Sequence, residues 1–286
     1  MISYIGGKYK QASWMYHYVP NDFNEYAEVF GGAFWFYLRT DLYKQVQKAY
    51  YNDFNRLMVN LIECSKPPNT KKFLEYIKNA NIIPKNENTF NKFRDEFIEL
   101  EKTPEIKTFN IPNYEYGIMY PYVLTHIFSG AGIKPKSIMM NFGDAKNHKY
   151  SAFIERLKDS EFQEKMSKIE TSNLDFEDFV KKHDKPDIFM YFDPPYYKTE
   201  NYYSFHNFGR EDHLRLVNIL KTMKGKFMIS YYNFPELEEW FPRDEYHWEE
   251  KDYKTTSSGK AGRKLKTQTE VLIMNYKPTS NLMEIW

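Results

Sequence analysis

The sequence predicts an α/β fold of Rossmann-like type, and three observations support this prediction. Short apolar segments typical of strands alternate with amphipathic segments typical of helices in both halves of the chain. The glycine pair Gly31-Gly32 follows the first expected strand, and Asp53 ends the next strand about 20 positions beyond Gly32. A later apolar strand over 188–192 stops abruptly at Asp-Pro-Pro-Tyr, residues 193–196. In open α/β sheets, ligands bind where such strands end.

The first part of the chain predicts two strands linked by a helix. A strand over 26–30 leads through the glycine turn into an apolar helix over 34–43, and a second strand follows over 48–52. A glycine turn and a helix N-terminus bring backbone N–H groups up to a nucleotide-like ligand. We therefore expect Gly32 at a binding site, with Asp53 holding a ribose hydroxyl as in Rossmann-like units.

Beyond residue 66 the composition changes to polar, aromatic and basic residues. Helices are expected over 55–65, 70–79 and 88–100, the first of them ending at two prolines. The stretch 120–146, which contains His126, is punctuated by glycine. Its lysines Lys134 and Lys136, with neighbouring Asn and Ser, are donors suited to phosphates and base edges. The alternative is an ordinary helical insertion with solvated lysines.

The second half again alternates between helices and strands. The expected helices cover 150–157, 176–182 and 210–223, and the expected strands cover 165–170, 188–192, 226–231, 246–253 and 269–276. Between the last two strands, 254–266 is a basic segment that also contains Gly and Ser. Its cations Lys260, Arg263 and Lys264 can bind phosphate groups. The histidines have no metal-ligand spacing, so no metal is expected.

Composition limits the class of protein. The chain has 286 residues, and its 40 Lys plus Arg nearly balance 39 Asp plus Glu, so a nucleic-acid surface must come from local clusters of charge. Aromatic residues make up 19% of the chain, which suits base stacking. Cys64 is the single cysteine, so a disulfide framework is excluded and a reducing compartment is expected. No segment approaches the roughly 18 apolar residues of a membrane span, which predicts a cytoplasmic protein without membrane contact.

The turn at 193–196 offers specific chemistry at the end of its strand. Two prolines cannot continue a sheet ladder, so the chain leaves the strand in a stiff turn. The Asp193 carboxylate and the Pro194 carbonyl are adjacent acceptors that can hold the two hydrogens of a planar exocyclic amine. Tyr196 supplies a face for a stacked nucleobase, an interaction worth about 1–3 kcal/mol. A solvated Asp in a proline turn is the ordinary alternative.

This turn, Asp193-Pro194-Pro195-Tyr196, resembles the catalytic motif of DNA adenine methyltransferases, which transfer a methyl group from S-adenosyl-L-methionine to the exocyclic amino group of adenine. The glycine turn is similar to the Glu-Pro-Phe-x-Gly-x-Gly cofactor motif of that family. Three of its positions match, at Glu28, Phe30 and Gly32, whereas Val29 replaces the Pro and Phe34 the last Gly.

Three other segments add to the resemblance. Tyr4-Ile5-Gly6-Gly7-Lys8, ahead of an expected helix over 11–18, resembles the aromatic-x-Gly-Gly-Lys segment with which these enzymes contact the cofactor. Asp53 and Asn55 match the Asp-x-Asn that follows the cofactor motif, and the basic segment 254–266 resembles a Ser-Ser-Asn-Gly-x-x-Arg-Lys loop. The segment 128–134 departs from the Asn-Gly hairpin of relatives that methylate GATC, so no recognition sequence is predicted.

The resemblance implies an α/β, Rossmann-like S-adenosylmethionine-dependent methyltransferase fold with a mainly helical target-recognition insertion. The catalytic domain would comprise 1–62 and 149–286, with target recognition in 63–148. Three groups of site residues are implied: catalytic Asp193, Pro194, Pro195 and Tyr196; cofactor-binding Tyr4, Lys8, Phe30, Gly32, Asp53 and Asp193; and DNA-binding Lys134, Lys136, Lys260, Arg263 and Lys264.

The implied function is site-specific adenine methylation of double-stranded DNA, with the target base flipped out of the duplex. The resemblance further implies a prokaryotic or phage-encoded enzyme. Whether a cognate restriction nuclease is a further partner stays open, as does the oligomeric state. Cytosine amino-methylation and RNA adenine methylation use the same geometry and stay open. A DNA-binding relative without catalysis is the alternative from another class.

Overall fold

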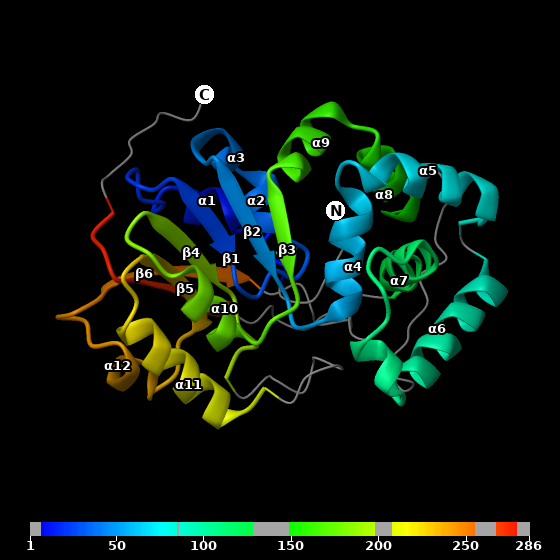
Figure 1. Cartoon of the computed structure of the whole chain (residues 1–286). Coiled ribbons are helices and arrows are strands. Elements are labelled where there is room, and N and C mark those ends of the chain that lie inside the picture. The colour runs from blue at the N-terminus through cyan, green and yellow to red at the C-terminus, as the bar shows by residue number, and fades with distance from the viewer. Residues whose placement is uncertain (1–6, 85, 128–148, 198–207, 255–266, 279–286) are drawn as a thin grey trace.

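In the computed structural model of the chain, residues 7–84, 86–127, 149–197, 208–254 and 267–278 are described. They form a seven-stranded sheet with helices packed around it (Figure 1). The strands are β1 (Glu25–Glu28), β2 (Lys48–Asn52), β3 (Ile169–Ser172), β4 (Ile188–Phe192), β5 (Lys226–Tyr232), β6 (His247–Lys254) and β7 (Thr267–Met274). The helices are α1 (Ala12–Tyr16), α2 (Trp35–Arg39), α3 (Leu42–Gln45), α4 (Arg56–Ser65), α5 (Asn69–Ala80), α6 (Glu87–Glu101), the 3-10 helix η1 (Pro104–Lys107), α7 (Tyr114–His126), α8 (Lys149–Leu157), α9 (Ser160–Ser167), α10 (Phe176–His183), α11 (Arg210–Lys221) and α12 (Leu237–Trp240).

The sheet order is β3-β2-β1-β4-β5-β7-β6. The first five strands in that order are parallel, whereas β7 lies antiparallel to both of its neighbours. The chain moves outward from β1 through β2 to β3 and then returns to β4 on the other side of β1. This makes the gap between β1 and β4 a topological switch point, where ligands of open α/β sheets bind. The predicted α/β class is confirmed.

Successive residues of the central strands face opposite cores. Tyr26 of β1 and Phe189 of β4 belong to one hydrophobic cluster, together with residues of α1, α2 and α4. Their neighbours Ala27 and Met190 belong to a second cluster with α10, α11 and α12. Strand side chains alternate between faces, so a sheet covered on both sides produces the continuous apolar run seen in β4.

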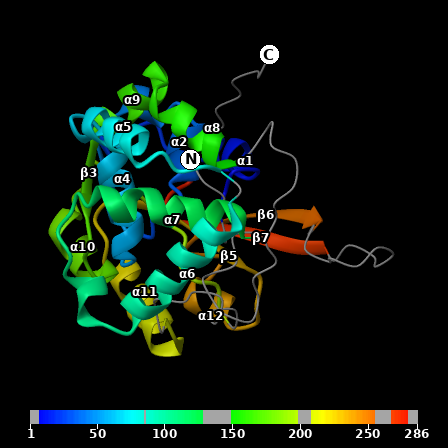
Figure 2. The same ribbon diagram turned by 90° about the vertical axis from the view of Figure 1, so that its right-hand side faces the viewer.

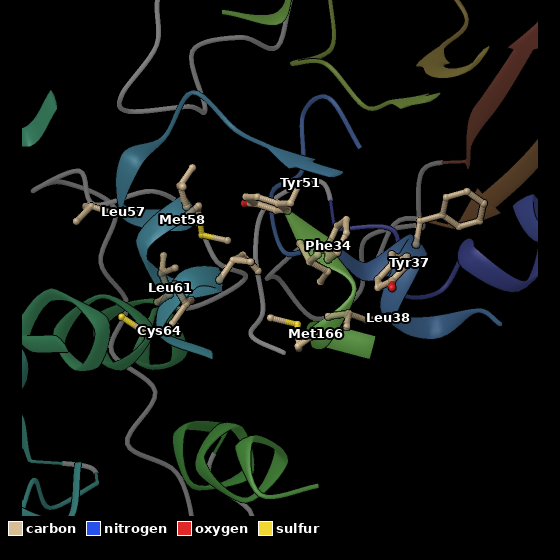
Figure 3. Close-up of a cluster of buried hydrophobic side chains, with 14 of the residues drawn as sticks. Phe34, Tyr37, Leu38, Tyr51, Leu57, Met58, Leu61, Cys64 and Met166 are labelled. Carbon is tan, nitrogen blue, oxygen red and sulfur yellow. The ribbon is translucent and has the colours of Figure 1, made fainter. Parts of the chain in front are cut away.

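The helices between β2 and β3 form a group beside the β3 edge of the sheet. In both views α5, α6 and α7 lie together on this side, and α7 contacts α4, α5, α6 and α8 (Figure 2). The expected helices over 55–65, 70–79 and 88–100 are confirmed as α4, α5 and α6. Figure 3 shows part of the first core, where α2, β2, α4 and α9 meet around Phe34, Tyr51, Leu61 and Met166.

The glycine-punctuated stretch 120–146 begins in a helix that was not predicted, because its first residues belong to α7. Asn113 caps this helix by accepting a hydrogen bond from Tyr116 N at 3.0 Å. Tyr120 and His126 are both buried, so neither side chain is accessible at the surface. A helix that is apolar on every side has to be covered by other elements, as α7 is. The remainder, including Lys134 and Lys136, lies outside the described residues.

Two other boundaries differ from the prediction. The helix over 34–43 divides into α2 and α3 because Thr40 has extended backbone angles, φ −122° and ψ 171°, and its hydroxyl donates to Phe36 O. The strand predicted over 165–170 begins only at Ile169, since residues up to Ser167 belong to α9. The missed signal is Asp159, whose side chain accepts from Phe162 N at 2.8 Å and caps α9.

None of the helices in the described ranges has both the length and the apolar character needed to cross a membrane. Within the same ranges, no three or more His, Cys, Asp and Glu side chains gather in a way that could hold a metal ion.

Candidate active site

A cavity of about 540 Å³ opens at the carboxyl ends of β1, β2 and β4. Its volume falls in the range of roughly 300–1,000 Å³ typical of small-molecule sites. Six of the residues predicted from the sequence line it: Lys8, Phe30, Gly32, Asp53, Asp193 and Pro195. The chain thus brings together residues that are far apart in sequence, at the topological switch point where the fold predicts a ligand.

The glycine turn after β1 is held against β2. The ideal Cβ position at Gly31 lies 2.2 Å from Cε2 of Tyr51, so no larger residue fits there without movement of the ring. Gly32 has a positive φ of 46°, a conformation that favours glycine. The Tyr51 hydroxyl donates to Gly32 O at 2.9 Å, which fixes the turn to the second strand.

Replacing Gly31 by Ala is expected to lower the free energy of unfolding by about 1–3 kcal/mol, because an overpacked methyl group displaces the buried Tyr51 ring. Urea unfolding followed by circular dichroism measures this loss. Gly209→Ala is the matched control, since a Cβ at Gly209 meets no atom within 4 Å. A Gly31→Ala variant as stable as the Gly209→Ala variant would show that the turn has room to relax.

Phe34 stands where the resembled motif has its last glycine, and its backbone keeps the conformation that favours glycine. Its φ and ψ are 58° and 31°, in the left-handed region. Such a conformation costs a non-glycine residue about 1–2 kcal/mol. The ring is fully buried and packs 5.1 Å from the Tyr51 ring and 4.7 Å from the Tyr37 ring. Burial of the ring, worth about 1.5–3 kcal/mol, offsets the cost of the conformation.

Asp53 follows β2 and is hydrogen-bonded to the glycine turn in the wall of the cavity. Its two carboxylate oxygens accept from Gly32 N and Asn55 N, each at 2.7 Å. Burial raises the pKa of Asp53 to about 6, and the two backbone donors oppose this rise. At neutral pH the carboxylate is therefore ionised, and its remaining lone pairs can accept hydrogen bonds from ligand hydroxyls.

Aromatic rings form another wall of the cavity. Phe30, Phe176 and Phe208 all line it, with ring centroids 5.6 to 5.8 Å apart. Phe208 was not predicted from the sequence, because it lies at the end of a long polar segment. The Arg215 guanidinium lies 4.7 Å from the centre of the Phe176 ring. Because these rings line the cavity, the faces that they present to it suit a flat heteroaromatic ligand.

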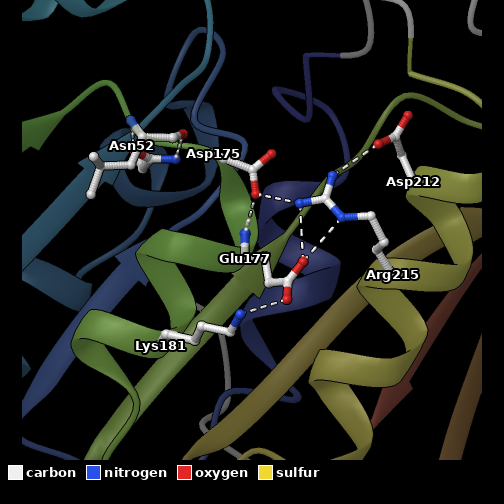
Figure 4. A network of polar contacts seen from close by, with 7 residues as sticks. Asn52, Asp175, Glu177, Lys181, Asp212 and Arg215 are labelled. Atoms are coloured by element: carbon white, nitrogen blue, oxygen red, sulfur yellow. Dashed lines mark hydrogen bonds and ion pairs between the residues drawn. The ribbon is translucent and has the colours of Figure 1, made fainter.

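Arg215 also links the two helices that flank this wall. Its guanidinium pairs with Asp175 at 2.8 Å and with Glu177 at 3.0 Å, both near the start of α10, and with Asp212 of α11 at 3.0 Å (Figure 4). Asp175 and Asp212 both line the cavity. The network therefore holds the N-terminal ends of α10 and α11 together at the mouth of the cavity.

Asp193 ends β4 and lies in a buried cluster of charges. Its Oδ1 accepts from Lys8 Nζ at 2.6 Å and from Ser230 Oγ at 3.1 Å. Burial raises the pKa of Asp193, and the Lys8 charge opposes the rise. Burial alone would lower the pKa of Lys8, but Asp193 and then Glu270 raise it to about 12. The lysine is therefore held as a cation between two carboxylates.

Tyr196, in the predicted catalytic turn, lies under Lys8. The Lys8 Nζ is 4.7 Å from the centre of its ring, and the ring is buried beside Tyr231 and Tyr232. Its hydroxyl donates to Oε1 of Glu270 on β7. Glu270 was missed in the sequence analysis, although an acidic residue leading into the apolar run of β7 is a signal for a buried, paired carboxylate.

Glu28, at the end of β1, adds another buried acid to the cavity wall. Its Oε1 accepts from Tyr37 N at 2.8 Å and from the Tyr26 hydroxyl at 3.0 Å. Burial raises the pKa of Glu28 to about 8, more than these two donors lower it. Near neutral pH this side chain is thus mostly uncharged in the protein alone.

Six predicted site residues cannot be placed. Tyr4 at the N-terminus and the DNA-binding candidates Lys134, Lys136, Lys260, Arg263 and Lys264 lie outside the described residues.

A seven-stranded α/β sheet in this order, with a glycine turn and an acidic turn at its switch point, is consistent with a Rossmann-like S-adenosylmethionine-dependent methyltransferase fold. A family model matches residues 4–257, and the chain belongs to this family, the D12 class N6 adenine-specific DNA methyltransferases. The chain is accordingly an adenine-specific DNA methyltransferase, and DNA is its substrate.

Three relatives are Type II methyltransferases. M1.LlaDCHI from Lactococcus lactis subsp. cremoris is 27% identical over 96% of this chain and 94% of its own length. M.CviBI from Paramecium bursaria Chlorella virus NC1A is 25% identical over 96% of this chain and 99% of its own. M.FokI from Planomicrobium okeanokoites is 22% identical, and the match covers 96% of this chain but 42% of the relative.

Proposed function

We propose that the chain transfers a methyl group from S-adenosyl-L-methionine to the exocyclic amine of an adenine flipped out of double-stranded DNA, with Asp193 and Pro194 holding the amine. One observation carries this proposal: Asp193 and Asp53 line the same cavity, one beside the charge cluster and the other beside the glycine turn. A nucleotide-like methyl donor and a target amine can therefore meet within one site.

The cavity residues fit S-adenosyl-L-methionine. Asp53 offers carboxylate lone pairs for the two ribose hydroxyls, and the Gly31-Gly32 turn has no side chain in the way. Phe30 and Phe176 offer ring faces for an adenine. Glu28, a mostly uncharged acid that lines the cavity, can donate a hydrogen bond to the ligand or accept one from it. When bound, this cofactor supplies an electrophilic methyl group on its sulfonium.

Asp193 and Pro194 orient the adenine amine. The Asp193 carboxylate and the Pro194 carbonyl accept its two hydrogens, so the nitrogen lone pair is left to point at the methyl group. The raised pKa of Asp193 makes its carboxylate a better acceptor for the proton that the amine loses on methylation. Tyr196 supplies a ring against which the base packs. Because an adenine inside a duplex cannot reach this cavity, it must first be flipped, at a cost of a few kcal/mol.

For the domains, we propose that 63–148 recognises the target sequence and that 1–62 and 149–286 form the catalytic domain. Support comes from the grouping of α5, α6 and α7 beside the β3 edge (Figure 2). Glu101 and Lys107, which belong to α6 and η1, line the cavity. The helical part would therefore also close the cofactor site.

The test is incubation of the purified protein with methyl-labelled S-adenosyl-L-methionine and unmethylated genomic DNA, followed by nucleoside analysis and single-molecule sequencing. We expect label in N6-methyladenine at one defined motif. That motif also identifies the sequence at which to assay a cognate restriction nuclease. Label in a cytosine derivative, or no label with folded protein, would contradict the proposal.

Replacing Asp53 by Asn is expected to weaken S-adenosyl-L-methionine binding about tenfold or more, because hydrogen bonds to a charged group contribute about 1.5–3 kcal/mol. Titration calorimetry measures the affinity. Asp244→Asn is the control, since Asp244 is exposed and does not line the cavity. Equal affinity of the Asp53→Asn and Asp244→Asn variants would remove Asp53 from the cofactor site.

A further inference from the structure

We infer that Lys8 occupies the adenine position while no base is bound, and that Glu270 is the positioning residue that receives Lys8 from Asp193 when the base enters. This inference rests on the proposed function, because it concerns the same turn at 193–196. Glu270 lies on β7, outside the catalytic motif at 193–196, so the motif itself gives this residue no role.

Lys8 makes both of the contacts that the target adenine needs. Its ammonium donates to Asp193 Oδ1 at 2.6 Å, and it lies 4.7 Å from the centre of the Tyr196 ring. An ammonium has three donors and no acceptor, so it satisfies Asp193 in the same way as the hydrogens of an amine. Over the ring, the cation takes the place of a stacked base. Base and lysine therefore compete for one position.

Lys8 cannot leave Asp193 without another anion. The lysine side chain is 5% exposed, and an isolated buried ammonium costs several kcal/mol. Glu270 supplies the second carboxylate, with its Oε1 3.5 Å from Lys8 Nζ and its side chain 4% exposed. A rotation of the Lys8 side chain away from Asp193 and toward Glu270 would give a charge-assisted hydrogen bond of about 2.7–2.9 Å to Glu270. The lysine can thus release Asp193 and remain paired.

Glu270 is well placed to remain fixed while Lys8 moves. It lies on β7 between two antiparallel neighbours, in register with Tyr232 of β5 and Lys251 of β6. Its Oε1 also accepts from the Tyr196 hydroxyl. Burial raises the pKa of Glu270, and the Lys8 charge is the main influence that opposes this rise. The Lys8 charge therefore helps to keep Glu270 ionised.

The test is a double-mutant cycle of Lys8→Met and Glu270→Gln. It uses a duplex with 2-aminopurine at the target adenine of the motif found by sequencing. Fluorescence without cofactor reports the flipped base, and single-turnover methylation reports the rate. We expect Glu270→Gln to reduce the 2-aminopurine fluorescence and the methylation rate about tenfold each, because Lys8 then stays on Asp193. In the Lys8→Met background, the same substitution should change either quantity by less than about twofold. An equal loss in both backgrounds would overturn the inference, because Glu270 would then act through Tyr196 or packing.

Three controls separate the explanations. Glu250→Gln makes the same chemical change on β6, where Glu250 pairs with Arg243, and should behave as wild type. Tyr196→Phe removes the hydroxyl that donates to Glu270 Oε1, so it should reproduce the loss of Glu270→Gln only if Glu270 acts through this bond; we expect a smaller loss. If Glu270→Gln does not fold, Lys8→Met alone decides, because removal of the competitor should leave 2-aminopurine flipping unchanged or increase it. Reduced flipping in Lys8→Met would overturn the inference.

Different results would contradict the proposed function of the turn and the positioning role of Glu270. If Asp193→Asn methylates as wild type, the proposed function of the turn is wrong. If Asp193→Asn is inactive and Glu270→Gln matches wild type in flipping and rate, only the role of Glu270 is wrong.

Discussion

Replacing Asp193 by Asn is expected to lower the single-turnover methylation rate about 100- to 1,000-fold, the usual loss when one preorganised group that stabilises a transition state is removed. Asn has nearly the same size as Asp, but it has only one acceptor oxygen and carries no charge. The amine would then lose its orientation and its proton acceptor together. Lys8 keeps a partner in Glu270, so the fold should survive.

The measurement is methyl transfer with enzyme in excess over DNA, so that product release does not limit the rate. Asp187→Asn serves as the control. Asp187 directly precedes β4, at the opposite end of that strand from Asp193, and it is about half exposed. Cofactor binding by calorimetry should change much less than the rate. A variant that loses cofactor binding and rate in proportion would place Asp193 with the cofactor and not with the adenine.

The sequence predicts the parts of this fold that follow from periodicity and backbone chemistry. The strand over 188–192 matches β4 residue for residue, because a short apolar run bounded by prolines has few other structures available. The spacing of a Rossmann-like unit predicts Gly32 and Asp53 at the same end of the sheet, and both line the cavity there. The hydrogen bond of 2.7 Å between them was not predicted.

What the sequence does not predict depends on contacts between distant segments. Lys8 and Glu270 meet at 3.5 Å from opposite ends of the chain, and no local pattern indicates which of the many acids pairs with a given lysine. The helix α7 was missed because residues 120–126 have no polar face, so the periodicity that signals a helix is absent. The tertiary fold decides which side chains are buried, so the sequence alone predicts neither the Lys8–Glu270 pair nor the helix α7.

The same buried charges make the stability of the protein depend on pH, and Glu28 gives the clearest case. Its pKa rises from 4.5 in the unfolded chain to about 8 in the folded protein, chiefly through burial. Between these values the folded protein keeps a proton that the unfolded chain has released. The stabilisation from Glu28 is therefore fully present below pH 4.5 and is lost as the pH rises through about 8.

Replacing Glu28 by Gln should remove this dependence, because the amide keeps an acceptor oxygen for Tyr37 N and does not titrate. Relative to wild type, the variant should have a similar unfolding free energy near pH 5 and gain about 2–5 kcal/mol by pH 8.5. Urea unfolding at a series of pH values measures the difference, and the value at low pH serves as the internal control. A constant difference across the series would mean that Glu28 is ionised in the folded protein. The cavity beside Asp193 would then hold a permanent negative charge, with Lys8 as the nearby cation that compensates it.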